Sequence, residues 1–495
     1  MRTFCWLICL CWSSLAFAQF TPVNSPTYTY QWYQSGEMCD YVFLGMYRFI
    51  SPAPRVPVNL ILDRNGDVVW YHQSRPWMLD FKVQPNGLLS FNQNDRHYLL
   101  DSTFSLVDSV FCDGYNTDVH DLIIDEDGHY YVICYEDSIM DLSSIRTRNG
   151  TPGDSACYVL GNVVQELDEN KNSVRTWHSF ANYDVYTDID SQYWTNPALI
   201  DIIHTNSLDL DDQGRMLMSH RNINEVTLVD WESGNVIWRF SGKNNDFSLP
   251  NDIGLSGQHD ARFSGSDRFT VFDNGNFHPA VMSRGVEYEV NPGTMTATKV
   301  WEYARNTARS NSLGSFRILP NGNRLINFGS FNPQDQAQIA LVGPDSSLIM
   351  EMDFQDTYWT YRAQCMEFPF VIERPEISCE VQNNQIVLTA QGSHPDYLWS
   401  TGDSGPSITL TDTGSYQVFV PLGIGMVGSV PIHITDLSAT CPAVSTPEAR
   451  QPVRRRKLMA TYDMLGRPIT QRRSGELYIE LYDDGSTRKI LFDYR

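Results

Sequence analysis

The chain has 495 residues and a formal net charge of −23 at pH 7. A nucleic-acid partner needs a basic face, so this charge argues against nucleic-acid binding. With about 475 residues left once an N-terminal leader is removed, the chain is too long for one ordinary domain.

Residues 1–18 have the pattern of a signal peptide. Arg2 supplies the positive charge, residues 4–12 form a short apolar run, and Ala16-Phe17-Ala18 is a small-residue cleavage site. The mature chain is therefore expected to begin at Gln19 and to be secreted. The apolar run is too short to cross a bilayer, and no other stretch approaches about eighteen apolar residues, so no transmembrane segment is predicted.

Two kinds of hairpin alternate between residues 40 and 370. The inner kind turns on Gly with Asp or Asn and occurs at 80–91, 120–134, 204–219, 259–274 and 315–329. The outer kind, which in several cases ends in a Trp, occurs at 58–71, 97–111, 163–177, 226–240, 286–303 and 340–354.

Each inner and outer pair predicts a four-stranded sheet, which is the blade of a propeller. The first blade lacks an inner hairpin, and residues 361–368 are expected to supply its innermost strand from the C-terminal side. The pattern therefore predicts an all-β, six-bladed β-propeller over residues 19–371. An open pair of β-sandwiches is the structural alternative.

Residues 372–441 change character and predict a second β domain. Trp399 followed by a D-x-G-x-Y run at 412–416 resembles an immunoglobulin-like (Ig-like) β-sandwich with a tyrosine corner. A Pro- and Arg-rich linker is expected at 442–457.

The last segment, 458–495, is too short to hold a large core by itself. Its strings YDMLGRPI and GELYIELYDDGSTRKILF closely resemble the C-terminal sorting domain of the type IX secretion system. The resemblance implies a small β domain, recognition by the type IX secretion machinery, and release or attachment at the cell surface.

Seven cysteines remain after the leader is removed, and none are spaced as C-x-x-C, which disfavours a structural zinc site. Cys365 lies on the proposed closing strand and Cys39 just precedes its neighbour, so the two are expected to form a disulfide. Cys379 and Cys441 flank the second domain and are the other expected pair. An odd count leaves at least one thiol unpaired within the chain.

Alignment of the inner hairpins on their turns places one set of residues at the start of each innermost strand: Asp80, His120, His204, His259 and Ser315. Three consecutive blades thus present an imidazole to one end of the channel, and Arg362 arrives there from the closing strand. Such a triad could hold a divalent metal. Carboxylate support comes only from Asp80, Asp121 and Asp260, so we predict no metal and no cofactor.

The strings around these residues point to a family. His204-Thr-Asn206-Ser, Gln-His259, Phe-Asp-Asn274-Gly, Ser-Arg284-x-x-Glu-Tyr and Tyr-Arg362-Ala resemble, in the same order, motifs of the PAPS-independent arylsulfotransferases. The resemblance covers roughly residues 45–370. It implies a propeller that carries a sulfuryl group on a histidine, from an aryl sulfate donor to a phenolic acceptor.

The resemblance also implies roles for particular residues. His259 and His204 would be catalytic, while the substrate-binding residues would be His120, Asn206, Asn274, Arg284 and Arg362. A protonated imidazole or a guanidinium suits the charge that spreads over the sulfuryl oxygens during transfer.

The sequence departs from the pattern in the last blade, where residues 328–334 contain no histidine at the place expected for the sulfated one. His259 or His204 then takes that role, or the transfer is direct, or the protein does not transfer sulfate. The alternatives are a non-catalytic binding propeller for a glycan or small molecule, and a hydrolytic or lyase activity on the same scaffold.

Overall fold

The computed structural model describes residues 15–16, 28–34, 39–47, 56–280, 282–305, 309–330, 338–354, 358–366, 368, 370–437, 441, 458–463, 467–469, 476–482 and 487–492. The expected leader, apart from residues 15–16, and the expected linker at 442–457 lie outside these residues. In the described part of the chain, no helix is long and apolar enough to cross a membrane.

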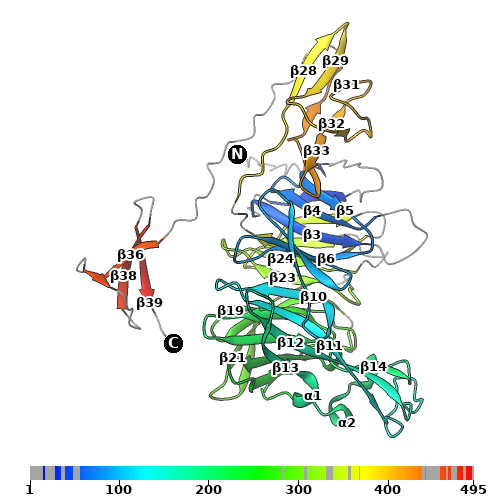
Figure 1. Ribbon diagram of the computed structural model, residues 1–495, viewed down its shortest axis with the longest axis vertical. Coiled ribbons are helices and arrows are strands. Elements are labelled where there is room, and N and C mark those ends of the chain that lie inside the picture. Colours follow the sequence, from blue (N-terminus) through cyan, green and yellow to red (C-terminus); the bar gives the residue numbers. More distant parts are fainter. Residues whose placement is uncertain are drawn as a thin grey trace, which may run out of the picture. The chain divides into compact units, whose positions relative to one another are not determined.

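Strands dominate the described residues, and six four-stranded antiparallel arrangements form the blades of a propeller (Figure 1). Blade 1 contains β27 (Trp359–Met366), β3 (Tyr41–Tyr47), β4 (Val58–Asp63) and β5 (Val68–Gln73), in that order. Blade 2 contains β6 (Met78–Val83), β7 (Leu89–Gln93), β8 (Arg96–Leu100) and β9 (Leu106–Val110).

Blade 3 contains β10 (Asn116–Ile124), β11 (Tyr130–Met140), β12 (Cys157–Leu167) and β13 (Ser173–His178), with β14 (Leu199–Asp201) parallel to β12. An insertion of this blade carries α1 (Ser179–Asn182), α2 (Val185–Asp188) and the 3-10 turn η1 (Ser191–Tyr193). Blade 4 contains β15 (Thr205–Leu210), β16 (Arg215–His220), β17 (Glu225–Asp230) and β18 (Val236–Phe240), with the 3-10 turn η2 (Arg221–Ile223) after β16.

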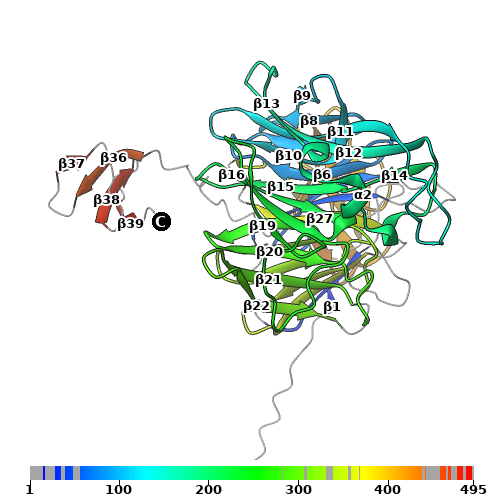
Figure 2. The ribbon, with the colours of Figure 1, turned by 90° about the horizontal axis from the view of Figure 1, so that it is seen from below.

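Blade 5 contains β19 (His259–Gly265), β20 (Arg268–Asp273), β21 (Arg284–Asn291) and β22 (Thr296–Ala304), which follow one another from the middle of the propeller to its edge (Figure 2). Blade 6 contains β23 (Ser315–Ile318), β24 (Arg324–Asn327), β25 (Ile339–Val342) and β26 (Leu348–Phe354). Outside β26 the sheet continues with β2 (Tyr28–Trp32) and β1 (Leu15–Ala16).

The ring closes as the sequence predicts. Neighbouring innermost strands contact one another in the order β27, β6, β10, β15, β19, β23 and back to β27. In blade 1, β27 pairs with β3, with Ala363 opposite Leu44. A disulfide joins Cys39 to Cys365 at a Cα–Cα distance of 5.6 Å, so the ends of the propeller are covalently linked.

Bulges interrupt five of the innermost strands among the described residues. The register shifts lie between Leu79 and Lys82, Thr117 and Leu122, Thr205 and Ser207, His259 and Arg262, and Thr360 and Ala363. A bulge adds a residue to one strand and redirects its side chain. Here each bulge falls where a polar residue faces the channel.

Residues 373–437 form three further groups of strands. One sheet contains β28 (Ile377–Gln382), β29 (Gln385–Ala390) and β31 (Ser407–Thr409), and a second contains β32 (Gly414–Tyr416) and β35 (Ile432–Ile434). The third group, β30 (Leu398–Trp399), β33 (Val418–Leu422) and β34 (Gly425–Gly428), continues the sheet of blade 1, because β34 pairs with β5.

The interior of this region is built around Trp399, which is fully buried. The Tyr416 hydroxyl donates to the Asp412 carbonyl oxygen over 2.6 Å, a bond of the kind a tyrosine corner makes. The predicted disulfide between Cys379 and Cys441 is present, with a Cα–Cα distance of 5.7 Å.

The chain divides into two compact units, of which the first spans residues 1–368 and 373–445. The second contains residues 369–372 and 446–495. Its described strands, β37 (Pro468–Ile469), β36 (Leu458–Asp463), β38 (Glu476–Tyr482) and β39 (Thr487–Phe492), form one antiparallel sheet in that order.

A third disulfide, between Cys112 and Cys134, was not among the expected pairs. Cys112 lies just before β10, the first strand of blade 3, and Cys134 lies in β11, the second strand. Among the cysteines that the structure describes, Cys157 is left without a disulfide, and it is buried.

Candidate active site

Two histidines from neighbouring blades meet at the channel. His120 lies in β10 and His204 directly precedes β15, and their ring centroids are 4.7 Å apart. His204 has a positive φ of 52°, a conformation that costs free energy in a residue other than Gly and that is common at functional sites.

Each of these two rings is held by a carboxylate. His120 Nδ1 lies 2.5 Å from Asp118 Oδ1, and His204 Nδ1 lies 2.5 Å from Asp201 Oδ2. Burial alone would raise the pKa of Asp118, but the charge and hydrogen bond of His120, with the Tyr135 hydrogen bond and the charge of His204, together hold that pKa below its usual value. A carboxylate only accepts, so in each case Nδ1 donates its N–H, and Nε2 is the ring nitrogen that faces away from the carboxylate.

His259, in β19, has different partners. Its Nδ1 lies 2.7 Å from Asn274 Oδ1. The amide nitrogen of Asn274 donates to the carbonyl oxygens of Ser310 (3.0 Å) and Leu313 (2.9 Å), which fixes its oxygen toward the ring. The histidine therefore donates from Nδ1 and keeps its lone pair on Nε2.

Burial, followed by the positive charge of Arg221, lowers the pKa of His259 well below its usual value. The ring is therefore neutral near pH 7, as a nitrogen nucleophile must be. The main-chain N–H of Leu313 approaches Nε2 at 3.2 Å, and Leu313 itself has a positive φ of 66°.

Arg221 is a site residue that the motif comparison did not identify. In the hairpin of β15 and β16, Thr205 pairs with His220, and the next residue, Arg221, donates its main-chain N–H to the His204 carbonyl over 3.1 Å. In the sequence, the feature that could have identified Arg221 as a site residue is its position directly across the predicted hairpin from His204.

The guanidinium of Arg221 has few partners. Its Nη1 donates to Asn222 Oδ1 (2.8 Å), and its Nη2 lies 3.4 Å from the Asn311 carbonyl. Nε is buried without a hydrogen-bond partner, and within the described residues no carboxylate forms an ion pair with this side chain. It is the kind of group that could bind a sulfuryl oxygen.

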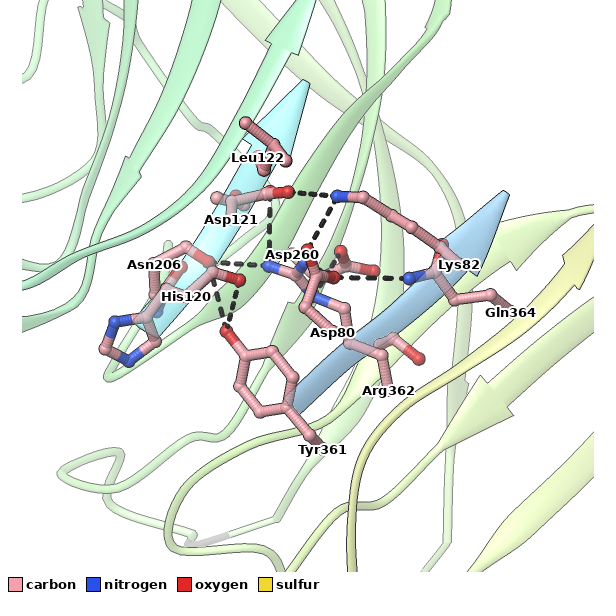
Figure 3. Close-up of polar contacts among 12 residues, drawn as sticks. Asp80, Lys82, His120, Asp121, Leu122, Asn206, Asp260, Tyr361, Arg362 and Gln364 are labelled. Carbon is pink, nitrogen blue, oxygen red and sulfur yellow. Dashed lines mark hydrogen bonds and ion pairs between the residues drawn. The ribbon is translucent and has the colours of Figure 1, made fainter. Parts of the chain in front are cut away.

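Beside the histidines, a network of buried charges fills the channel (Figure 3). We call it the channel ion cluster, and it contains Asp80, Lys82, Asp121, Asp260, Arg262, Arg317 and Arg362. Its members come from β6, β10, β19, β23 and β27. Arg262 Nη2 lies 2.7 Å from Asp121, Lys82 Nζ lies 2.7 Å from Asp80, and Arg317 Nη2 lies 2.9 Å from Asp260.

Opposite charges in this cluster stabilise one another. Burial opposes ionisation of Asp260, but the guanidinium groups of Arg317 and Arg262 more than offset it and hold the pKa of Asp260 well below its usual range. Unpaired charges at this depth would be very costly, so the cluster depends on all of its members.

Three residues expected to bind substrate are engaged with the protein itself. Arg362 belongs to the channel ion cluster, where it pairs with Asp80 and donates to the Asn206 carbonyl over 2.6 Å. Arg284 is paired with Asp252, Asp273 and Glu302. Asn274 orients His259, as described above.

Asn206 is buried, and its side-chain amide donates to the Gln258 carbonyl over 2.8 Å. Its Oδ1 has no hydrogen-bond partner. Tyr361, from the closing strand, donates its hydroxyl to the His120 carbonyl over 3.2 Å. Both residues thus support the main chain that carries the histidines (Figure 3).

Fold and site together define a six-bladed β-propeller with histidines clustered at its channel. Residues 92–355, more than half of the chain, match the sequence model of the family described as Arylsulfotransferase (ASST). The chain belongs to the arylsulfotransferase family.

Among solved structures, a protein of unknown function from Bacteroides caccae is similar at 10% identity, covering 66% of this chain and 98% of its own, with a TM-score of 0.42. An inactive variant of virginiamycin B lyase from Staphylococcus aureus, crystallised with quinupristin, has 9% identity, covers 77% of this chain and 99% of its own, and has a TM-score of 0.35. A streptogramin B lyase has 10% identity, 71% and 92% coverage and a TM-score of 0.32. No curated protein matches the chain.

Proposed function

We propose that the protein is an exported arylsulfotransferase that moves a sulfuryl group from an aryl sulfate to a phenol by way of His259. The observation that carries this proposal is the difference between the histidines. His259 is held neutral by Asn274 and by burial, whereas His120 and His204 each have a carboxylate at Nδ1.

In the first half-reaction, the lone pair of His259 Nε2 attacks the sulfur of the donor. The bond between sulfur and the aryl oxygen breaks, and the leaving phenolate takes a proton from His204. Nε2 takes up the sulfur in place of its contact with the Leu313 N–H. The Nδ1–H bond to Asn274 stays in place and stabilises the charged ring.

In the second half-reaction, the acceptor phenol returns a proton to His204 as its oxygen attacks the sulfur. The bond from Nε2 to sulfur breaks, and the electron pair returns to His259. Arg221 and His120 donate to the sulfuryl oxygens throughout, where charge accumulates in the transition state. No cofactor enters either step.

A non-catalytic binding propeller is the second candidate function. It is favoured by the Leu313 amide, which occupies the His259 lone pair at 3.2 Å. The absence of a histidine from residues 328–334, where the family resemblance leads one to expect the sulfated residue, also favours this candidate.

The deciding experiment incubates the mature protein with p-nitrophenyl sulfate, with and without a phenolic acceptor. Release of nitrophenol that depends on the acceptor supports transfer, and release without acceptor indicates a sulfatase. No release by the unmutated protein favours the binding propeller. Mass spectrometry after donor alone should locate a sulfuryl group on His259, and a His259→Ala variant should not become labelled.

We also propose that residues 372–441 form an Ig-like module and that residues 458–495 are a type IX sorting domain. The Tyr416 to Asp412 hydrogen bond supports the first assignment. The YDMLGRPI string and the separation of residues 446–495 into their own compact unit support the second.

A further inference from the structure

Beside the candidate active site, two aromatic rings contact each other and are flanked by two arginines. The rings of Tyr193 and Phe277 meet edge to face, with centroids 4.9 Å apart. Arg221 lies over the Tyr193 ring at 4.9 Å, and Arg148 lies over the Phe277 ring at 5.0 Å. We call the four residues the arginine–aromatic stack.

A chain of hydrogen bonds connects the arginine–aromatic stack to His259. The Tyr193 hydroxyl donates to Asn224 Oδ1 over 2.9 Å, and the same oxygen accepts the Gly257 N–H at 2.8 Å. The Gly257 carbonyl in turn lies 3.1 Å from His259 Nδ1. Burial raises the pKa of Tyr193 to about 12, so its hydroxyl remains a donor at neutral pH.

Phe277 is placed by the same part of the fold. It follows Asn274, which orients His259, and its main-chain N–H donates to Ser256 Oγ over 3.0 Å. Arg148 lies in the loop between β11 and β12 of blade 3, and its main-chain N–H donates to the Trp194 carbonyl over 2.8 Å.

The two arginines differ in exposure. Arg221 lies at the histidines, whereas Arg148 is exposed at the far end of the stack. Within the described residues, Arg148 makes no ion pair with a carboxylate. Phe277 and Tyr193 are each partly exposed. An apolar aromatic face flanked by two cations, one of them at the reacting centre, suits an aromatic ring that carries negative charge at both ends.

We propose that the arginine–aromatic stack binds the aryl ring of the substrates, and that Arg148 selects phenols and aryl sulfates that carry a second anionic group, such as a carboxylate or sulfonate. This inference rests on the proposed transfer at His259. The sulfuryl end lies at Arg221 and the histidines, the ring lies against Phe277 and Tyr193, and the distal anion faces Arg148.

The kinetic test uses Arg148→Gln with p-nitrophenyl sulfate as donor and compares 4-hydroxybenzoate with phenol as acceptor. We expect the ratio of kcat/KM for the two acceptors to fall by about fivefold, as loss of one exposed charge pair predicts. The rate with phenol reports any effect that the loss of the Arg148 contact with Phe277 has on the ring site itself, and the ratio isolates the contribution of the distal anion. An unchanged ratio overturns the proposal.

The matched control is Arg96→Gln. Arg96 also lies over an aromatic ring, that of Phe111, at 5.2 Å, but it belongs to blade 2 and is paired with Asp95. It should leave the acceptor ratio unchanged. A fall of the same size in this variant would attribute the effect to the overall charge of the protein and would overturn the role of Arg148.

A binding experiment separates this inference from the proposed function. Calorimetry with 4-sulfobenzoate and benzenesulfonate, neither of which can transfer a sulfuryl group, should show tighter binding of the doubly anionic compound, and Arg148→Gln should remove that preference. If no transfer is found but the preference and its loss are, the stack is a ligand site and only the transferase function fails. Equal binding of both compounds to the unmutated protein would overturn the proposal that the arginine–aromatic stack selects a second anionic group.

Discussion

At the scale of single residues, the candidate site depends on what each histidine meets at Nδ1. Asn274 offers His259 a neutral oxygen, while Asp118 and Asp201 offer carboxylates to His120 and His204. Three imidazoles of the same repeat position thereby have two kinds of partner at Nδ1, an amide oxygen in one case and a carboxylate in the other two.

The first residue-scale prediction concerns Asn274. Replacing it with Ala removes the acceptor that fixes the His259 tautomer, so kcat for transfer should fall on the order of 10- to 100-fold while KM changes little. Asn274→Asp should instead retain the hydrogen bond and raise the pKa of His259, moving the acid limb of the pH–rate profile to higher pH. Steady-state rates between about pH 5 and 8 measure both effects. An Asp variant whose profile matches that of the unmutated protein would show that Asn274 does not act through His259.

The second residue-scale prediction concerns Arg221. Arg221→Gln should raise KM for p-nitrophenyl sulfate and lower kcat, with a combined loss on the order of 100-fold, because in the proposed reaction the guanidinium donates to the sulfuryl oxygens both in the bound donor and in the transition state. Arg221→Lys keeps the charge and should recover part of that loss. The matched substitution Arg284→Lys lies in a saturated ion cluster, and its effect should appear in thermal stability. If the Arg221 variants bind donor normally, the sulfuryl group lies elsewhere.

Part of this site could be predicted from the sequence and part could not. The shared position of His120, His204 and His259 follows from the repeat, because equivalent residues in successive blades face one channel. The carboxylate partners of Arg284 and Arg362 come from other strands, so a motif that names the arginine does not reveal that its donors are already occupied. Arg221 was missed because what distinguishes it is that no carboxylate of the described residues pairs with its guanidinium, and only the fold reveals this.

At the scale of the elements, the closing strand β27 decides whether the propeller is a ring. Its register with β3 is interrupted by the bulge between Thr360 and Ala363, which places Arg362 in the channel ion cluster. The same strand carries Cys365, so one element provides the hydrogen bonds, the ion pairs and the covalent link of the closure.

We therefore predict that Cys365→Ser lowers the free energy of unfolding by about 2–5 kcal/mol, since the lost disulfide no longer restricts the unfolded chain. Denaturant unfolding without reductant measures the change. Cys157→Ala is the control, because Cys157 forms no disulfide and its removal should cost less. Equal losses in the two variants would mean that the closure adds no stability beyond core packing.

Two buried histidines in the blades should make the fold sensitive to acid. Burial, with the charge of Lys82, lowers the pKa of His97 to about 4, and burial, with the charge of Arg239, lowers that of His220 to about 3. Both values lie below the unfolded value of about 6.5, so only the unfolded chain takes up these protons as the pH falls. The contribution of these two neutral histidines to the free energy of unfolding is therefore fully present above about pH 6.5 and declines as the pH falls below that value.

The expected decline is up to about 2 kcal/mol per histidine by about pH 4.5. Thermal unfolding of the unmutated protein and of His220→Gln at pH 7 and at the lower pH measures it, and the variant should lose less stability on acidification. A variant with the same pH dependence as the unmutated protein would show that His220 is not buried in its neutral form.

The hairpins of the blades could be predicted because each carries its own turn residues and apolar strands. The pairing of β5 with β34 could not, because it joins residues more than three hundred positions apart, and β5 by itself has the sequence of an ordinary outer strand. Its polar contacts, such as the Trp70 indole donating to the Leu422 carbonyl over 3.2 Å, are to main-chain atoms and leave no motif.

At the scale of the whole molecule, the chain combines a compact unit that holds the site with a separate C-terminal unit. Deleting residues 456–495 should leave the thermal unfolding of the first unit unchanged. In the secreting cell, the truncated protein should accumulate in the periplasm while the full chain reaches the surface. Fractionation with an antibody against the propeller measures the difference, and normal surface delivery of the truncated chain would refute the sorting assignment.

The disulfide between Cys39 and Cys365 also determines how the propeller responds to mechanical load. A pull on the chain beyond residue 368 reaches the ring at the end of β27, where it would otherwise peel that strand away from β3 one hydrogen bond at a time. The covalent link passes the load to the start of β3 before the peeling reaches Ala363 and Arg362. With the proposed attachment at the cell surface through the C-terminal segment, flow would then stretch the chain while the channel with its histidines keeps its shape.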